Sequence, residues 1–195
     1  MARLKREGMP RMKTLKLATA MLLLTSGVAL AEAHANPMVG GAPMFADKNI
    51  VENAVNSADH TTLVAAVTAA GLAETLMGEG PFTVFAPTND AFAKLPAGTV
   101  ETLLLRENKD TLVKILTCHV VAANALAGDI IGMVEADGGE YTVGTVGGCD
   151  FTVMAKDGAV MIKDGQGNVA NVTIADVRQS NGVIHVIDTV LLPAM

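Results

Sequence analysis

The chain has 195 residues, of which 20 are acidic and 14 basic, and its aromatic content is 3% with no tryptophan and one tyrosine. An acidic chain repels the phosphates of nucleic acids and anionic lipids. Single-stranded nucleic acids also need aromatic side chains on which bases stack. The composition therefore excludes nucleic acid as a partner.

The first 31 residues predict a secretory signal peptide. Six Lys and Arg residues precede a short apolar run at 17–30, and small-x-small cleavage patterns stand at 29–31 and 33–35. Cleavage is expected after residue 31 or residue 35. The alternative is an N-terminal membrane anchor, but a run of about 14 apolar residues is short for a span of about 20. We therefore expect no stable membrane span after cleavage.

The remaining chain carries 8 basic and 19 acidic residues, a net charge of −11. Its length of about 160 residues suffices for one domain with a proper core. Residues 36–47 contain two prolines and two glycines, which predict a flexible lead-in. The domain itself is expected over residues 48–195.

The front half of this domain predicts helices. Apolar residues recur at helical spacing in 50–55 and again in 63–70, where Gly71 suits the C-terminal cap. Shorter helices are expected near 72–77, 100–104 and 112–116. Between them, the β-branched and aromatic run 82–85 predicts a strand that Pro87 ends, and Thr88 suits the N-cap of a helix that buries Phe92.

The back half predicts strands. Residues 183–187 are apolar at most positions, which predicts a strand buried on both faces. The loop 164–167 contains Asp-Gly and predicts a hairpin, and Asn181-Gly182 predicts a turn. The other expected strands are 118–121, 141–146, 151–153, 160–163 and 169–174. Helices followed by strands predict an α+β fold with a largely antiparallel sheet.

Two segments about a hundred residues apart carry a family resemblance. Phe-Ala-Pro-Thr-Asn stands at 85–89 with Ala-Phe at 91–92, and Gly-x-x-His-x-Ile-Asp-x-Val-Leu-x-Pro runs from Gly182 to Pro193. The chain thereby resembles the fasciclin-type domain over roughly 49–193. The resemblance implies a β-wedge decorated by several short helices. Its structural motif residues are Phe85, Pro87, Thr88, Asn89, Phe92, Gly182, His185, Asp188 and Pro193.

The resemblance implies an exported, non-enzymatic adhesion or interaction module. Such a module binds a protein or another cell-surface macromolecule at the cell envelope. The module itself is expected in the periplasm, or secreted and located at the cell surface. The alternative is a periplasmic binder of a small apolar or glycan ligand. The lack of tryptophan argues against a site where a sugar stacks on an aromatic ring, but the sequence does not exclude an apolar pocket between the wedge and the helices.

The family's adhesive residues imply candidate binding positions. In animal relatives an Asp-Ile pair and a central Tyr-His pair have adhesive roles, and the matching positions are Asp176-Val177 and Cys118-His119. Asp176, Val177 and His119 are therefore the candidate binding residues, although Val replaces Ile and Cys replaces Tyr. The competing interpretation makes Asp176 a structural turn or cap residue before the turn at 180–182.

The two cysteines, Cys118 and Cys149, predict a disulfide, because an even count in an oxidising compartment favours pairing. Two buried free thiols are the alternative.

The sequence predicts no catalytic residue, metal or cofactor. On a strand, His185 shares a face with Val183 and Ile187 while Asp188 faces the other way, which predicts a buried structural histidine. Strand neighbours also point apart, so His119 is not expected to activate Cys118. The two serines after the leader lie in no nucleophile elbow. The loop 164–168 lacks the full ligand set of a calcium loop and predicts a plain turn.

Overall fold

The structure is a computed structural model that describes residues 36–194, so the expected signal peptide and its cleavage sites lie outside the described residues. Within 36–194, no helix combines the length and the apolar character that crossing a bilayer requires.

Short helices fill the front half, as predicted. Asn49 begins the first of them with a capping box, in which its side chain accepts from the Glu52 N–H and the Glu52 side chain accepts from the Asn49 N–H. Gly71, with φ +75°, ends the second. The α-helices of this half are α1 Ile50–Ala54, α2 Thr61–Ala70, α3 Ala73–Met77, α4 Asn89–Ala93, α5 Thr99–Leu103 and α6 Lys109–Cys118, with 3-10 turns at Ala58–His60 and Arg106–Asn108.

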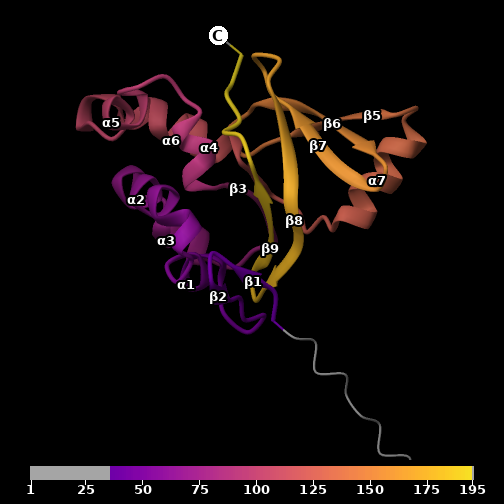
Figure 1. Ribbon diagram of the computed structural model, residues 1–195, viewed down its shortest axis with the longest axis horizontal. Coiled ribbons are helices and arrows are strands. Elements are labelled where there is room, and N and C mark those ends of the chain that lie inside the picture. The colour runs from indigo at the N-terminus through magenta and orange to yellow at the C-terminus, as the bar shows by residue number, and fades with distance from the viewer. Residues whose placement is uncertain (1–35, 195) are drawn as a thin grey trace, which may run out of the picture. The chain divides into compact units, whose positions relative to one another are not determined.

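A seven-stranded sheet forms the centre of the fold (Figure 1), in the order β4-β3-β9-β8-β7-β6-β5. The pair β3 and β9 is parallel and the other neighbours are antiparallel, which confirms the α+β class with a largely antiparallel sheet. The strands are β3 Phe82–Pro87, β4 Val120–Val121, β5 Glu140–Gly144, β6 Asp150–Lys156, β7 Ala159–Lys163, β8 Val169–Gln179 and β9 Gly182–Ile187.

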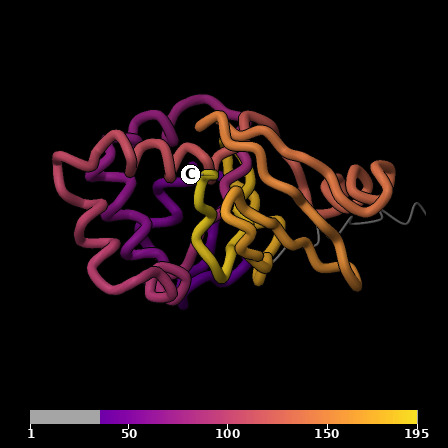
Figure 2. The backbone as a smooth tube through the Cα atoms, turned by 90° about the horizontal axis from the view of Figure 1, so that it is seen from above, coloured from indigo at the N-terminus to yellow at the C-terminus, as the bar shows by residue number. Residues whose placement is uncertain are grey.

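Strands β3 and β9 form a wall between two hydrophobic cores. Helices α1 to α6 gather on one side of the wall, and the β5–β8 strands with α7 (Ala127–Ala136) lie on the other (Figure 2). All six residues of β9 are buried, so this strand is covered on both faces as predicted.

We call the two clusters the helical core and the hairpin core. The helical core consists of Val39, Met44, Ile50, Leu63, Ala66, Ala70, Leu76, Val84, Ala86, Ala91, Phe92, Leu112, Ile115, Leu116, Val120, Val177, Ile184, Val186 and Val190. The hairpin core consists of Phe85, Cys118, Ile130, Val134, Cys149, Phe151, Val153, Val160, Ile162, Ala170, Ile187 and Leu191.

The turn at Asn181-Gly182 ties the sheet to the helices. The Asn181 side chain accepts from the Ile50 N–H and donates to the carbonyls of Leu76 and Gly78. A Cβ on Gly182 would lie 2.0 Å from the Phe82 carbonyl oxygen, so only glycine lets β9 start beside β3. The predicted turn therefore also fixes the position of α1 and α3.

Three sequence predictions fail in detail. Residues 36–47 are not a flexible lead-in, because strands β1 Met38–Val39 and β2 Ala42–Pro43 form a hairpin that buries Val39. Cys118 ends helix α6 and does not begin a strand. The back half was predicted as strands only, but it also contains helix α7. Gly128 and Gly132 lower the helix propensity of this segment, so the packing of its apolar side on the hairpin core stabilises it.

Candidate functional site

The family-matched binding residues do not form one surface. Asp176 is exposed, whereas Val177 is 0% exposed and His119 is 2% exposed. Val177 belongs to the helical core, and both ring nitrogens of His119 are bonded to the backbone. Of the three candidates, only Asp176 can reach a partner without local unfolding.

Asp176 lies inside β8 at a β-bulge, not in the turn at 180–182. Its φ is +58°, a left-handed conformation that Asp tolerates better than most residues. Its carboxylate Oδ1 accepts from the Ala127 N–H at 2.7 Å, at the start of α7, and its own N–H donates to His185 Nδ1 at 3.3 Å. The bulge thus joins β8, β9 and α7, which favours the structural interpretation of Asp176.

His185 is buried, with 1% exposure, on the hairpin-core side of β9. Its Nε2 lies 2.9 Å from the Ala125 carbonyl oxygen. Its ring stacks on the ring of Phe85, with the two ring centroids 5.8 Å apart. Since Nε2 must donate to that carbonyl, Nδ1 is free to accept from Asp176, and the ring is the neutral Nε2–H tautomer. Burial lowers the pKa of His185, with the Ala125 carbonyl and Asp176 opposing it in part.

Asp188 does not contact His185, in agreement with its expected orientation. Its carboxylate accepts from the backbone N–H and the side-chain amide of Asn171 at 2.8 Å and 3.0 Å and pairs with Lys94 at 3.5 Å. Burial acts to raise the pKa of Asp188, but the bonds from Asn171 and Thr189, together with Lys94, lower it overall. Asp188 therefore fastens the end of β9 to β8.

The first motif block fastens helices in the same way. Thr88 caps α4 by accepting from the Ala91 N–H at 3.2 Å, as predicted. Asn89 accepts from the Thr62 N–H at 3.0 Å and donates to the Ala58 carbonyl at 2.9 Å. Phe92 then packs in the helical core. The block holds α4 against the start of α2.

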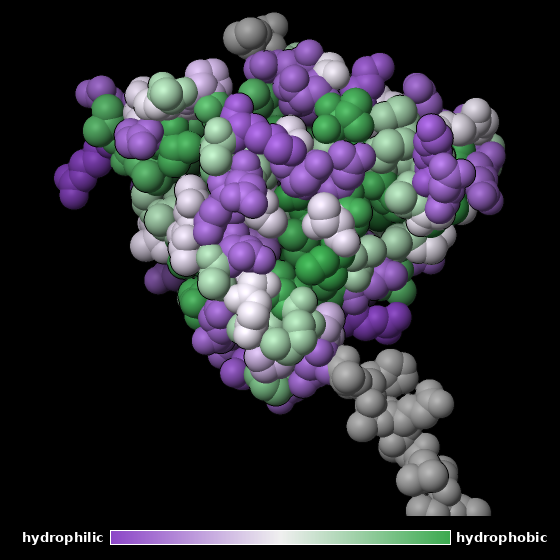
Figure 3. Space-filling model, viewed as in Figure 1, coloured by the Kyte–Doolittle hydropathy of each residue, from purple (hydrophilic) through white to green (hydrophobic). Residues whose placement is uncertain are grey.

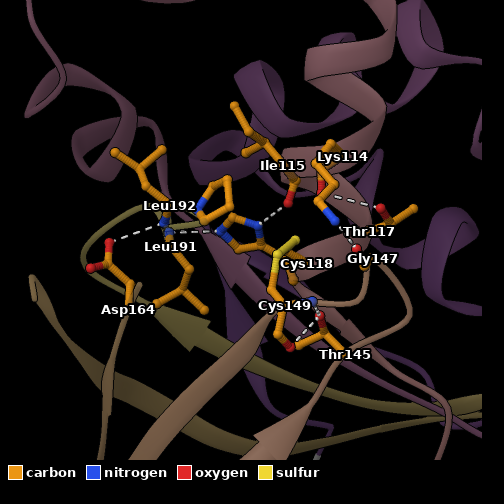
Figure 4. The surroundings of a disulfide bond; sticks show 12 residues. Lys114, Ile115, Thr117, Cys118, Thr145, Gly147, Cys149, Asp164, Leu191 and Leu192 are labelled. Atoms are coloured by element: carbon orange, nitrogen blue, oxygen red, sulfur yellow. Dashed lines mark hydrogen bonds between the residues drawn. A yellow bond between two sulfur atoms is a disulfide. The ribbon is translucent and has the colours of Figure 1, made fainter. Parts of the chain in front are cut away.

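His119 follows the end of α6 and is buried, with 2% exposure. Its Nδ1 donates to the Ile115 carbonyl at 2.8 Å, and its Nε2 accepts from the Leu191 N–H at 2.9 Å (Figure 4). Burial lowers the pKa of His119 to about 4, against a raising effect of Ile115 and Asp164. His119 is thus a neutral histidine that satisfies two backbone groups.

The predicted disulfide between Cys118 and Cys149 is present, with Cα atoms 5.4 Å apart. It joins the end of α6 to the turn between β5 and β6, as Figure 4 shows. A Cβ on Gly147 would lie 2.7 Å from Cys118 Sγ, so glycine permits this approach. The Lys114 side chain donates to the Gly147 carbonyl and fixes the same turn.

The loop after β7 is a turn, as predicted. The carboxylate of Asp164 accepts from the backbone N–H groups of Gln166, Asn168 and Leu192 and from the Asn168 amide. These donors occupy both oxygens, which leaves them poorly placed to coordinate calcium. Within the described part of the chain, no three or more His, Cys, Asp or Glu residues are grouped as a metal would require.

The two edges of the sheet differ. The β4 edge is covered, because the Val146 N–H donates to the Val120 carbonyl at 2.8 Å. The outer side of β5 carries no backbone hydrogen bond to any residue within 36–194. Sequence reasoning predicted the strand but not its edge position, since strand order depends on pairing between distant segments.

Acidic side chains lie on β5 and on the elements next to it. Glu135 and Asp137 lie at the end of α7, Glu140 begins β5, and Asp150 begins β6, and all four are exposed. In Figure 3 this side of the molecule, where Figure 1 places α7 and the end of β5, carries many hydrophilic residues. The edge therefore combines free backbone groups with negative charge.

Comparison with known proteins agrees with this architecture. The fasciclin domain family model matches residues 58–193. The chain is 56% identical over 146 residues to "Protein sll1483" of Synechocystis, spanning 75% of this chain and 74% of that protein. It is 38% identical over 122 residues to the cell surface glycolipoprotein MPB83 of Mycobacterium bovis, spanning 63% of this chain and 48% of that protein.

A solved structure shows the same fold. The chain superposes with a TM-score of 0.66, at 20% identity, on a FAS1 domain pair from the insect cell adhesion molecule fasciclin I, covering 74% of this chain and 51% of that one. The chain belongs to the fasciclin domain family. One of its relatives is named as a cell surface protein, and an interaction module is compatible with that name.

Proposed function

We propose that this chain is an exported, non-enzymatic interaction module that binds a protein or another cell-surface macromolecule at the cell envelope. The basic and apolar start of residues 1–31 supports export. Relatives described as a cell surface glycolipoprotein and a cell adhesion molecule support the class of function. His119 and His185, which use their ring nitrogens to bind backbone groups, support binding over catalysis.

The open edge of β5 is the observation that carries the proposal. The Thr145 N–H donates to the Cys149 carbonyl at 2.9 Å. Backbone groups of successive residues in a strand point alternately to its two sides. The N–H and C=O groups of Tyr141 and Val143 therefore point to β6, as the Thr145 N–H does, and those of Thr142 and Gly144 point outward. An extended segment of a partner can hydrogen-bond to these groups and extend the sheet.

The charge around the edge sets the kind of partner. Four exposed carboxylates attract a segment that carries Lys or Arg, and they repel a second copy of this acidic chain. The partner segment is therefore extended and basic. Because exposed charges are screened by salt, binding should weaken as ionic strength rises.

Affinity capture from envelope extracts tests the proposal. The protein is immobilised as the parent, as Thr142→Pro and as Thr142→Ala. Proline at an edge position removes an outward N–H without removing a bond of the β5–β6 ladder, so the fold should persist. We expect a captured partner to be lost with Thr142→Pro and retained with Thr142→Ala, and to be released by about 0.5 M salt.

Three results would contradict the proposal. Equal capture by Thr142→Pro, with an unchanged melting temperature, would show that the β5 edge is not the contact. Capture that resists salt and survives charge reversal of Glu135 and Glu140 would show that the partner is not recognised through basic residues. Cell fractionation that finds the protein outside the envelope fraction and the medium would contradict export.

A further inference from the structure

An apolar cavity of about 120 Å³ lies within the helical side of the fold. Residues of α1, α2 and α3 line it together with β3 and β9, and they include Val51, Val64, Leu76, Val84 and Ile184. Val55, which is 56% exposed, lies at its rim at the end of α1. An apolar cavity of about 150 Å³ stays dry and binds benzene. The volume here suits a single six-membered ring.

One side chain in the wall of this cavity is polar and incompletely bonded. His60 is 3% exposed, and its Nδ1 lies 2.8 Å from the Ser57 hydroxyl oxygen. Its Nε2 has no hydrogen-bond partner within residues 36–194. The Ala86 backbone acts to raise the pKa of His60 against the larger lowering by burial, so its carbonyl lies close to the ring, yet no hydrogen bond joins it to Nε2 within residues 36–194. Burying such a nitrogen without a partner destabilises the fold, because its lost hydrogen bond to water is not replaced.

The lack of a partner for His60 Nε2 sets His60 apart from the other two buried histidines. His119 and His185 bond through both ring nitrogens. Buried water usually makes about three hydrogen bonds, and most residues of this wall are apolar; the polar ones besides His60 are Ser57, Thr68, Thr75, Thr117 and His119. A hydroxyl or carbonyl on an apolar body would satisfy Nε2 and also fill the cavity.

We propose that this cavity is a binding site for a small, uncharged, ring-sized apolar molecule with one hydroxyl or carbonyl group, which bonds to His60 Nε2. The wall contains no Asp, Glu, Lys or Arg, so a charged ligand would be buried without a counter-ion. Burial also lowers the pKa of His60, which keeps the ring neutral near pH 7. The site lies mainly on the helical side of the β3–β9 wall, with Val146 of the β5–β6 turn in its lining, and neither the outward residues of β5 nor the four carboxylates line it.

Phenol and benzene are the probes, because they differ by one hydroxyl. The Ser57 hydroxyl can donate to Nδ1 or accept from it, so Nε2 is either a donor or an acceptor, and the phenol hydroxyl can meet both cases. Binding is followed by amide chemical-shift changes of the parent protein at neutral pH. We expect shifts at α1 and α2, and an affinity for phenol about three- to tenfold above that for benzene, as one buried hydrogen bond provides.

Two variants test the assignment. Val64→Phe fills the cavity from α2 and should abolish the binding of both probes. Its control, Val143→Phe, adds the same ring at a half-buried position beside the hairpin core and should leave binding unchanged. His60→Phe removes the nitrogen but keeps a ring, so phenol should lose its advantage over benzene.

The outcomes separate cleanly. If neither probe shifts the amides of α1 and α2, the site does not exist. If both bind but Val64→Phe leaves the affinities unchanged, the ligand lies elsewhere. If benzene binds the parent protein as tightly as phenol, His60 has no role in recognition, and this result needs no variant to fold.

Discussion

The helical core and the hairpin core share one wall, yet they differ in how tightly they are closed. On the hairpin side a disulfide and two histidines with both nitrogens bonded connect α6, β9 and the β5–β6 turn. On the helical side there are a cavity and a histidine, His60, one of whose ring nitrogens has no partner among the residues that the structure describes. Short helices leave gaps because each contributes only a few side chains, whereas paired strands and cross-links fix spacing. The hairpin side of the wall is thus rigidly cross-linked, and the helical side contains an unfilled cavity.

The largest expected effect comes from opening the cross-linked side. Replacing both Cys118 and Cys149 by Ala removes a link between residues 31 apart. On the chain-entropy model this should lower the free energy of unfolding by about 3–4 kcal/mol. Urea denaturation of the variant and the parent measures the loss, and the parent unfolded in reductant is the control. Equal stability of the variant and the parent would show that the disulfide does not close the hairpin side.

Acid should also weaken the closed side. The folded-state pKa of His119 is about 4, below the usual 6.5, so the neutral ring stabilises the fold fully above pH 6.5. This stability is lost as pH falls from 6.5 to 4, by about 3 kcal/mol in total. His60 and His185, whose pKa values are also lowered, act in the same direction.

Urea midpoints at pH 7 and pH 4.5 check the acid effect. The ring signals of His119 in NMR spectra give the control, since they should remain those of a neutral imidazole until about pH 4. Titration of that ring near pH 6.5 in the folded protein would contradict the prediction.

A smaller effect is expected at His185, within the hairpin side. His185→Ala removes the stacking on Phe85 and leaves the Ala125 carbonyl and the Asp176 N–H without their partners. We expect a loss of about 1–3 kcal/mol in unfolding free energy. Thermal melting of the variant against the parent measures it. A variant as stable as the parent would remove His185 from the list of residues that hold the bulge.

The smallest effect concerns the bulge itself. Asp176→Ala removes the bond to the Ala127 N–H and places Ala at φ +58°, so stability should fall by about 1–2 kcal/mol. Asp176→Asn keeps an acceptor and a residue that tolerates this φ, and it should lose less. Partner affinity of the folded fraction should stay unchanged. Lower affinity at an unchanged melting temperature would instead show that Asp176 is an adhesive residue.

At the candidate site, the sequence predicted the bonding and burial of single residues better than it predicted how those residues are arranged in space. The pairing of Cys118 with Cys149 followed from their number and the expected export, and the burial of His185 followed from strand alternation. The structure separates the three positions matched to the family's adhesive residues, because Asp176 is exposed whereas Val177 and His119 are buried. A sequence pattern cannot show that a bulge turns Asp176 outward while Val177 stays at 0% exposure. Nothing local marked His60 either, since its free nitrogen depends on distant segments.

By itself, the sequence determined the α+β class, most helices and strands, the turn at Asn181-Gly182 and the family. Those features depend on residue spacing, capping and turn propensity, which act over a few neighbouring residues. Tertiary structure decided the parallel pairing of β3 with β9, the two cores, the helix α7 with its two glycines, and the open edge of β5. These depend on contacts between segments far apart in the chain, where burial outweighs local preference.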